Sequence, residues 1–212
     1  TPHVTLERMA DITIEVRGAA HTTVAPERAT VHAAVTFDGA EATQVKTQVS
    51  HAVQRVREGL EHLQWRGALE GFSVDRVQVS AHRPWNEQGE QLPLIHTASV
   101  GIRATFTDFS EVGAVALAED LTVHDIEWHL TPATRAQVER DTRQAALRDA
   151  VVRAQDYADT LNLGTVQVRS VQDPGPAQHA PMMRAAAMAE ATLDLAPAAI
   201  EIEAQVLASF TA

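Results

Sequence analysis

The 212-residue sequence contains no cysteine, a single lysine and few aromatic residues. Without cysteine the chain has no disulfide bond, thiolate nucleophile or zinc–thiolate site. Lysine-based catalysis has one candidate, Lys46, because the rest of the 17 basic residues are arginines. The three tryptophans are scattered along the chain, so the sequence does not indicate an aromatic platform for stacking bases or sugars.

The chain also lacks a surplus of basic residues and a long hydrophobic run. Its formal net charge is −11, so nucleic acid would be repelled beyond any local basic patch. No apolar run approaches the roughly 20 residues that a transmembrane helix needs. A hydrophobic content of 45% with moderate charge is typical of a globular protein. The length allows one domain or two closely associated halves.

The longest helical pattern runs from Thr131 to Leu163. Thr131 is a suitable N-cap, Pro132 suits the first helical position, and Gly164 offers a left-handed stop. Apolar residues at steps of three and four predict one buried face. This predicted face comprises Leu147, Val151, Ala154, Ala158 and Leu161.

Two further helices are predicted by the spacing of a capping box, an acceptor followed three residues later by a carboxylate. The first follows Asp38-Gly-Ala-Glu41 and ends near Gly67 and Gly71. Its predicted apolar face comprises Val45, Val49, Ala52, Val56, Leu60 and Leu63. The second follows Asp108-Phe-Ser-Glu111 and extends to about Glu119.

Alternation of apolar and polar residues predicts strands at 12–18, 29–37, 72–85, 92–106, 123–130, 166–171 and 198–210. The turn Asn86-Glu-Gln-Gly89 joins two of them as a hairpin. The order ββα-ββα-βαβ-β favours an α+β fold, an antiparallel or mixed β-sheet with helices packed mainly on one face. We expect the other face to meet solvent or a partner.

We interpret residues 1–10 as a flexible leader and 11–212 as a single domain. Before the last strand, residues 174–196 form a Pro/Ala/Met-rich loop that exceeds the usual loop length. It holds three of the four methionines, Met182, Met183 and Met188, with Arg184 beside them. These residues could fill a groove on the protein or on a neighbouring subunit, bind a partner, or ligate Cu(I) through thioethers. Packing is the favoured interpretation.

No catalytic, cofactor or metal site is predicted from the ten histidines and the acidic residues. His124 and His129 point to opposite faces of one predicted strand, whereas His21 and His32 lie in adjoining strand patterns and could approach each other. Neighbouring carboxylates such as Glu201 and Glu203 more often keep a sheet face soluble than act as a catalytic pair.

The tryptophans have different predicted roles. Trp128 shares its strand face with Ile126 and Leu130, which favours a place in the core. Trp85 lies near the tip of the predicted hairpin and is the better candidate for an exposed contact, such as an oligomer interface. The candidate partner-binding residues are therefore Met182, Met183, Arg184, Met188 and Trp85.

Four regions together resemble the SIMPL-domain family, also catalogued as a domain of unknown function. They are Ile12–Gly18 with Val24–Val31, Thr97–Phe106 with Asp108–Val115, Arg143–Asp159, and Pro181–Met188. The resemblance covers about residues 11–211. It implies a tendency to oligomerise and, in bacteria, a role in the envelope or stress response. A signalling adaptor that binds a kinase gave the family its name, so protein interaction recurs there.

Many bacterial members of that family begin with a secretion signal, whereas this sequence begins with Thr1 and shows no charged and apolar leader. We expect a periplasmic location if a leader was removed, and a cytoplasmic one otherwise. The leading hypothesis is a non-enzymatic protein that acts through self-association and protein contacts. The alternatives are a metal- or ligand-binding protein that uses residues 174–196, and an enzyme of unrecognised mechanism.

Overall fold

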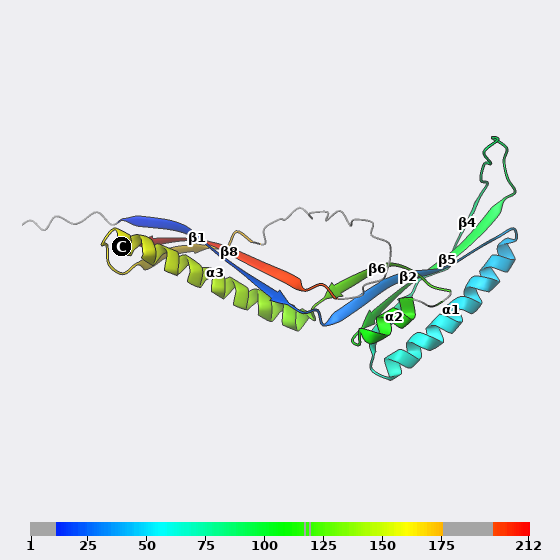
Figure 1. Ribbon diagram of the computed structural model, residues 1–212, viewed down its shortest axis with the longest axis horizontal. Helices are drawn as coiled ribbons and strands as arrows, with labels where there is room; N and C mark the ends of the chain where they lie inside the picture. The colour runs from blue at the N-terminus through cyan, green and yellow to red at the C-terminus, as the bar shows by residue number, and fades with distance from the viewer. Residues whose placement is uncertain (1–11, 117, 119, 176–196) are drawn as a thin grey trace, which may run out of the picture. The chain divides into compact units, whose positions relative to one another are not determined.

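The computed structural model describes residues 12–116, 118, 120–175 and 197–212, which fall into two compact units (Figure 1). We call residues 12–24, 132–175 and 199–212 the terminal unit, because it contains both ends of the described chain. The described residues of 25–131, together with 197 and 198, form the central unit. The predicted leader and most of the 174–196 loop lie outside the described residues.

The terminal unit is a three-stranded antiparallel sheet covered by one helix. Its elements are β1 (Thr13–Val24), α3 (Pro132–Thr160), β7 (Gln167–Gln172) and β8 (Ile200–Thr211). The strand order is β1-β8-β7, so the last strand of the chain occupies the centre of the sheet. The predicted alternation of β8 is confirmed: Ile202, Val206, Ala208 and Phe210 are buried, whereas Glu201 and Glu203 are exposed.

Helix α3 packs on β1 and β8 through a face made almost entirely of alanine. The buried residues are Thr142, Ala146, Ala150, Ala154 and Ala158. The predicted face was therefore partly wrong, because Val151 and Leu161 are exposed. Small side chains let the helix backbone approach the sheet closely, and the larger apolar side chains then lie along its flanks.

The central unit is a five-stranded antiparallel sheet with two helices. Its elements are β2 (Arg28–Gly39), α1 (Ala42–Trp65), β3 (Leu69–Val74), β4 (Gln78–His82), β5 (Ile95–Phe106), α2 (Ser110–Ala116) and β6 (Thr122–His129). The strand order is β3-β5-β2-β6. Strand β4 pairs with the first part of β5, and β3 pairs with its last part.

Both helices cover the same face of this sheet, where the core lies. Buried residues of β2 and β5, including Val31, Val35 and Phe106, pack there against Leu60 of α1 and Val112 of α2. Val45 and Val49, at the start of α1, pack against the first half of β5. The predicted apolar face of α1 is thereby confirmed. The opposite face of the sheet is polar and includes cross-strand hydroxyl pairs, of which Thr30–Thr105 is 3.0 Å long.

The helix ends follow the predicted signals only in part. Gly67 adopts φ +76° directly after α1, as a C-terminal glycine should. The predicted capping box at Asp38 is wrong, because Asp38 belongs to β2 and the N-cap is Glu41, without a side-chain cap bond. At α2, by contrast, Asp108 accepts hydrogen bonds from the hydroxyl (2.6 Å) and the backbone N–H (3.0 Å) of Ser110.

The α+β class, the antiparallel pairing and the packing of helices on one face are confirmed, and the element order approximately matches. Two details differ. The first two strands do not pair with each other, because β1 pairs with β8 while β2 pairs with β5 and β6. The predicted strand 72–85 is two strands, separated at residues 75–77, where the backbone N–H of Asp75 donates to the Gly101 carbonyl (2.9 Å).

Candidate interaction surface

Residues 77–94 of the central unit, which we call the arm, form a hairpin with the start of β5, and the part beyond His82 extends past the end of the sheet (Figure 1). The arm comprises β4 and the connection from β4 to β5. It exposes five large apolar side chains. These are Val77, Val79, Trp85, Leu92 and Leu94. A projecting segment of this composition exposes apolar surface that the protein's own core does not use.

The tip of the arm is held in one conformation by Asn86. The Asn86 side-chain oxygen accepts from the backbone N–H groups of Gln88 (3.1 Å) and Glu90 (2.7 Å). Its side-chain nitrogen donates to the Glu90 carboxylate (3.0 Å), and its backbone N–H donates to the Glu90 carbonyl (3.0 Å). Gly89 takes the positive φ of +79° that the turn requires. The predicted hairpin turn at residues 86–89 is confirmed.

Trp85 sits directly before this turn with 65% of its surface exposed. Its backbone pairs with Gln91 in an isolated bridge, and Pro84 accepts a hydrogen bond from the Leu92 N–H (2.8 Å). The indole is thus presented by an ordered backbone, so its exposure does not come from fraying. Its exposure is as predicted, while its role in partner binding stays a prediction.

A groove between α1 and α2, which we call the interhelical groove, lies on the same unit. Its lining is largely apolar and its volume is about 380 Å³. The apolar lining includes Val56, Leu60 and Leu63 of α1 and Ala114 and Val115 of α2. Leu121, which follows α2, completes it. The sequence did not reveal this groove, because it depends on where the short helix α2 settles against α1.

Two ion pairs border the interhelical groove. Arg55 pairs with Asp120, and Arg66 pairs with Glu111 at 2.8 Å. The side chain of Arg55 is 62% exposed against 30% for Asp120, and that of Arg66 is 47% exposed against 22% for Glu111. In each pair the arginine is more exposed to solvent than its carboxylate, and of these four residues Arg55, Glu111 and Asp120 line the groove.

The two histidines that the sequence suggested could approach each other lie on strands of different sheets, His21 on β1 and His32 on β2. His129 bonds to the Thr30 hydroxyl (2.8 Å), and His32 Nε2 stands 3.6 Å from the Glu127 carboxylate. Within the described ranges, no group of three or more His, Asp or Glu side chains is arranged to hold a metal ion.

The other four predicted partner-binding residues lie outside the described residues; they are Met182, Met183, Arg184 and Met188. The other two tryptophans lie in the central unit. Trp128 packs edge-to-face on Phe109, with ring centroids 4.9 Å apart, against the central core as predicted. Trp65 is exposed at the end of α1 and stacks on His62.

Two comparisons with known proteins complete this description. The family model SIMPL, described as "Protein of unknown function (DUF541)", matches residues 14–210. None of the curated proteins matches the chain. Among the helices that the structure describes, none is long and apolar enough to cross a membrane.

Proposed function

The chain belongs to the SIMPL family, whose function is unknown, and from this premise we propose that it acts through self-association and protein–protein contacts. In this proposal the protein is not an enzyme, and the arm is its principal contact surface. The observation that carries the proposal is the set of exposed apolar side chains on the arm, of which Trp85, directly before the turn, is the largest.

The physical properties of the arm support this role. Tryptophan is enriched among the few interface residues that supply most of the binding energy. The tip network around Asn86 orders the backbone before binding, so little conformational entropy is lost when a partner docks. An ordered hairpin that exposes Trp85, Leu92 and Leu94 thus has the composition and the rigidity of an interface element.

The wider biological setting of the proposal comes from the family resemblance alone. A role in the bacterial envelope or in the stress response would make the assembled protein, not a reaction product, the working species. The arm could serve contacts with its own copies and with other proteins in that setting. Self-association is the part of the proposal that a purified protein can test directly.

The test is sedimentation velocity on the wild-type chain at about 1–100 µM, beside Trp85→Ala and the matched control Tyr157→Ala. Tyr157 is also an exposed aromatic residue but lies on α3 of the terminal unit. We expect wild type and control to associate equally, and Trp85→Ala to weaken association about 30-fold or more, as loss of an interface anchor does.

Two results would overturn the proposal. A wild-type chain that stays strictly monomeric over this concentration range would remove self-association. Equal association of Trp85→Ala and wild type would remove the arm as the contact surface. Circular dichroism of each variant establishes that the fold is intact before the comparison is made.

A further inference from the structure

We propose that β4 pairs antiparallel with β4 of a second copy, about a twofold axis at Ser80, so that the two central sheets become one. This inference rests on the proposed function, and it states how the arm associates. It is carried by the backbone direction of β4, by the lack of protection along its outer edge, and by the charges at either end of the contact.

The outer edge of β4 presents backbone groups that its own sheet does not use. The Gly101 carbonyl of β5 points toward β3 and β4, since it accepts from the Asp75 N–H (2.9 Å). Backbone groups alternate in direction along a strand, so every second residue of β5 points the same way, and Ser80 is one of the β4 residues that meet them. The N–H and C=O groups of Val79 and Ala81 therefore point outward, where the structure describes no pairing strand.

Three other edge strands carry features that oppose pairing with another chain. Strand β6 has a register shift and the acidic residues Asp125 and Glu127, and β7 has a register shift at Arg169. On β1, the Ala19 N–H is already bonded to Asp149 of α3 (2.9 Å). Charges, bulges and covered backbone are the usual protection of sheet edges. Strand β4 has none of these: it contains no Lys, Arg, Asp, Glu or Pro, and its pairing with β5 is regular.

An uncharged strand is also what pairing with an identical copy requires, because a twofold contact brings the same surface together. With the axis at Ser80, this residue lies opposite itself, Val79 lies opposite Ala81, and Gln78 lies opposite His82. The register joins the outward backbone groups of Val79 to those of Ala81. It also brings no like-charged carboxylates or guanidinium groups together along the row.

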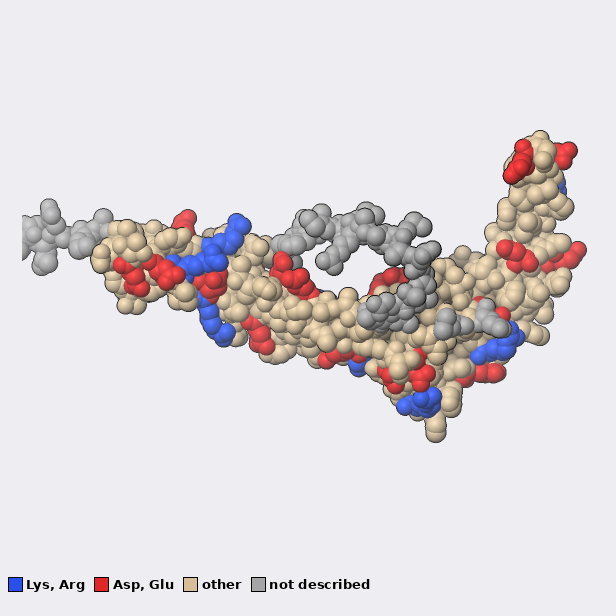
Figure 2. Space-filling view, viewed as in Figure 1, with Lys and Arg blue, Asp and Glu red and all other residues tan. Residues whose placement is uncertain are grey.

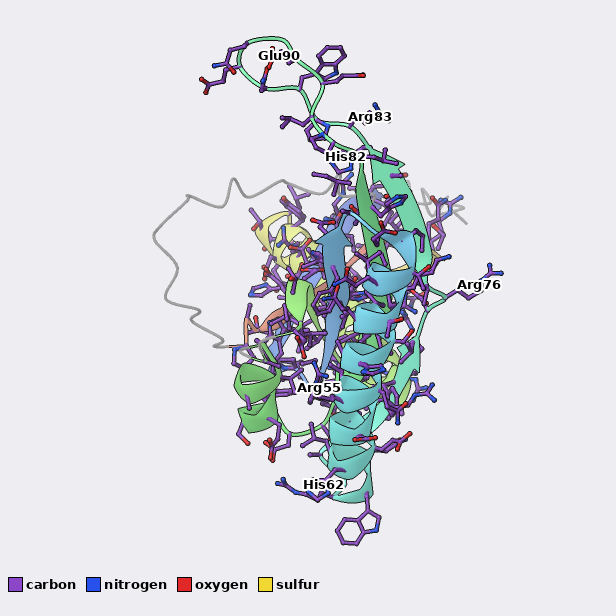
Figure 3. All side chains as sticks on the ribbon, turned by 90° about the vertical axis from the view of Figure 1, so that its right-hand side faces the viewer. Arg55, His62, Arg76, His82, Arg83 and Glu90 are labelled. Atoms are coloured by element: carbon purple, nitrogen blue, oxygen red, sulfur yellow. The ribbon has the colours of Figure 1, made fainter. Side chains whose placement is uncertain are left out.

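Antiparallel pairing carries the arm tip of each copy alongside the β3–β4 junction of the other, where opposite charges meet. Glu87 and Glu90 make the tip acidic, as Figure 2 shows. At the junction, Arg76 points away from the sheet (Figure 3) and forms no ion pair with any described residue. The Asp75 carboxylate is turned onto its own sheet, 2.5 Å from where a Cβ on Gly101 would lie. This complementarity favours a second copy over an unrelated chain.

The same register, continued along the arm, gives Trp85 a place in the contact. It brings Trp85 beside a recess of about 460 Å³, which residues 75–78 of the second copy line. Arg83 lies opposite Val77 of that copy, on the other face of the strand from Arg76. A tryptophan that enters a recess next to a paired edge is a usual interface anchor.

The centre of the contact can be tested by charge at Ser80, because this residue meets its own copy. Ser80→Glu and Ser80→Lys each place like charges opposite each other, so in sedimentation velocity each should associate at least about tenfold more weakly than wild type. An equimolar mixture should form a 1:1 heterodimer at least about tenfold tighter than either variant alone. Gln172→Glu and Gln172→Lys, at an exposed edge position on β7, are the controls and should associate as wild type.

The cysteine-free chain permits a second measurement of the register. Mild oxidation of Ser80→Cys should give a covalent dimer, because residues opposite each other in a non-hydrogen-bonded pair have Cα atoms about 4.5 Å apart, within the span of a disulfide. The matched control is Gln78→Cys, exposed on the same strand, which would meet residue 82 of the second copy and not itself. It should cross-link at least about tenfold more slowly in non-reducing electrophoresis. Circular dichroism establishes that each variant is folded.

Two results in a wild-type chain that associates would overturn the β4 pairing and leave the arm as a contact surface of another kind. One is a mixture of Ser80→Glu and Ser80→Lys that associates no more tightly than either variant. The other is cross-linking of Gln78→Cys as fast as Ser80→Cys. A monomeric wild type would instead overturn the proposed function together with this inference, so the two failures are distinguishable.

Discussion

Gly18 of β1 lies against Ala150 of α3 so closely that a Cβ added to the glycine would stand 2.8 Å from the alanine Cβ. The same added atom would lie 2.7 Å from the Ala150 backbone nitrogen, and nearer still to the Ala146 carbonyl oxygen. Real Cβ atoms essentially never approach other heavy atoms this closely. The packing of helix on sheet in the terminal unit therefore depends on the missing side chain of one residue.

Gly18→Ala should lower the free energy of unfolding by about 3 kcal/mol or more, because the obstructing atoms belong to a helix backbone that cannot rotate away. The matched control is Gly71→Ala on β3, where nothing lies within 4 Å of an added Cβ. That control should change stability by less than about 1 kcal/mol. Urea denaturation measures both, and a Gly18→Ala protein as stable as its control would contradict the packing described.

In helix α3, enlarging a buried alanine should destabilise the fold more than truncating an exposed leucine. Ala150→Leu inserts bulk into a fully buried position and should cost about 1–3 kcal/mol. Leu161→Ala removes a side chain that is 58% exposed and should cost less than about 1 kcal/mol. Thermal unfolding of the two variants beside wild type checks this order. A greater loss of stability for Leu161→Ala than for Ala150→Leu would contradict this packing and support the buried face that the sequence pattern predicted.

The Asp108 carboxylate at the start of α2 should show a pH signature. Its pKa lies below the usual value because the Ser110 hydroxyl donates to it, then because the Ser110 backbone N–H does, with a contribution from Arg66. Since the folded pKa is lowered, the stabilisation is present above the unfolded pKa of about 4 and is lost as pH falls through the folded value.

Ser110→Ala removes the largest of these causes and should raise the Asp108 pKa toward its usual value. An NMR titration of the side-chain carboxyl carbon measures this directly. The control is Ser50→Ala on α1, whose hydroxyl donates to the Lys46 carbonyl and not to Asp108. An Asp108 titration curve that Ser110→Ala leaves in place would show that the hydroxyl does not hold the charge.

Asn86→Ala should weaken self-association without changing the stability of the core. The substitution deletes the side-chain bonds that order the arm tip, so the chain would have to order that tip on binding. Loss of about one net hydrogen bond corresponds to roughly a tenfold weaker association. Sedimentation velocity provides the measurement, with Gln88→Ala in the same turn as the control. Equal association of both variants would argue that the tip needs no prior ordering.

The sequence predicted elements whose periodicity is unambiguous. The twofold alternation of β8 identified its buried row from Ile202 to Phe210, and the spacing from Val45 to Leu60 identified the buried face of α1. In α3 the same reasoning identified Ala154 and Ala158 correctly, but it also selected Val151 and Leu161, which are exposed because Gly18 makes alanine the better contact. Periodicity indicates which side of a helix is buried, but the shape of the sheet that it packs against determines which side chains fit there.

Strand pairing and the interhelical groove depend on contacts distant in sequence. Strand β1 pairs with β8, at the far end of the chain, although β2 follows it directly. The groove forms where Val56 and Leu63 of α1 meet Val115 of α2, which no local pattern encodes. Trp85 was identifiable because a turn signal, Asn86 to Gly89, placed it at a hairpin tip without any knowledge of the core.

The position of β8 in the centre of its sheet also determines when each unit can fold during synthesis. Nearly all of the central unit is one continuous segment, 25–131, so it can fold while the ribosome is still translating the rest. The terminal unit begins at β1 but needs the final strand to join β1 with β7. Until β8 has been translated, β1 and α3 remain without the strand that lies between β1 and β7, and a chain truncated before β8 would contain a folded central unit and an incomplete terminal unit.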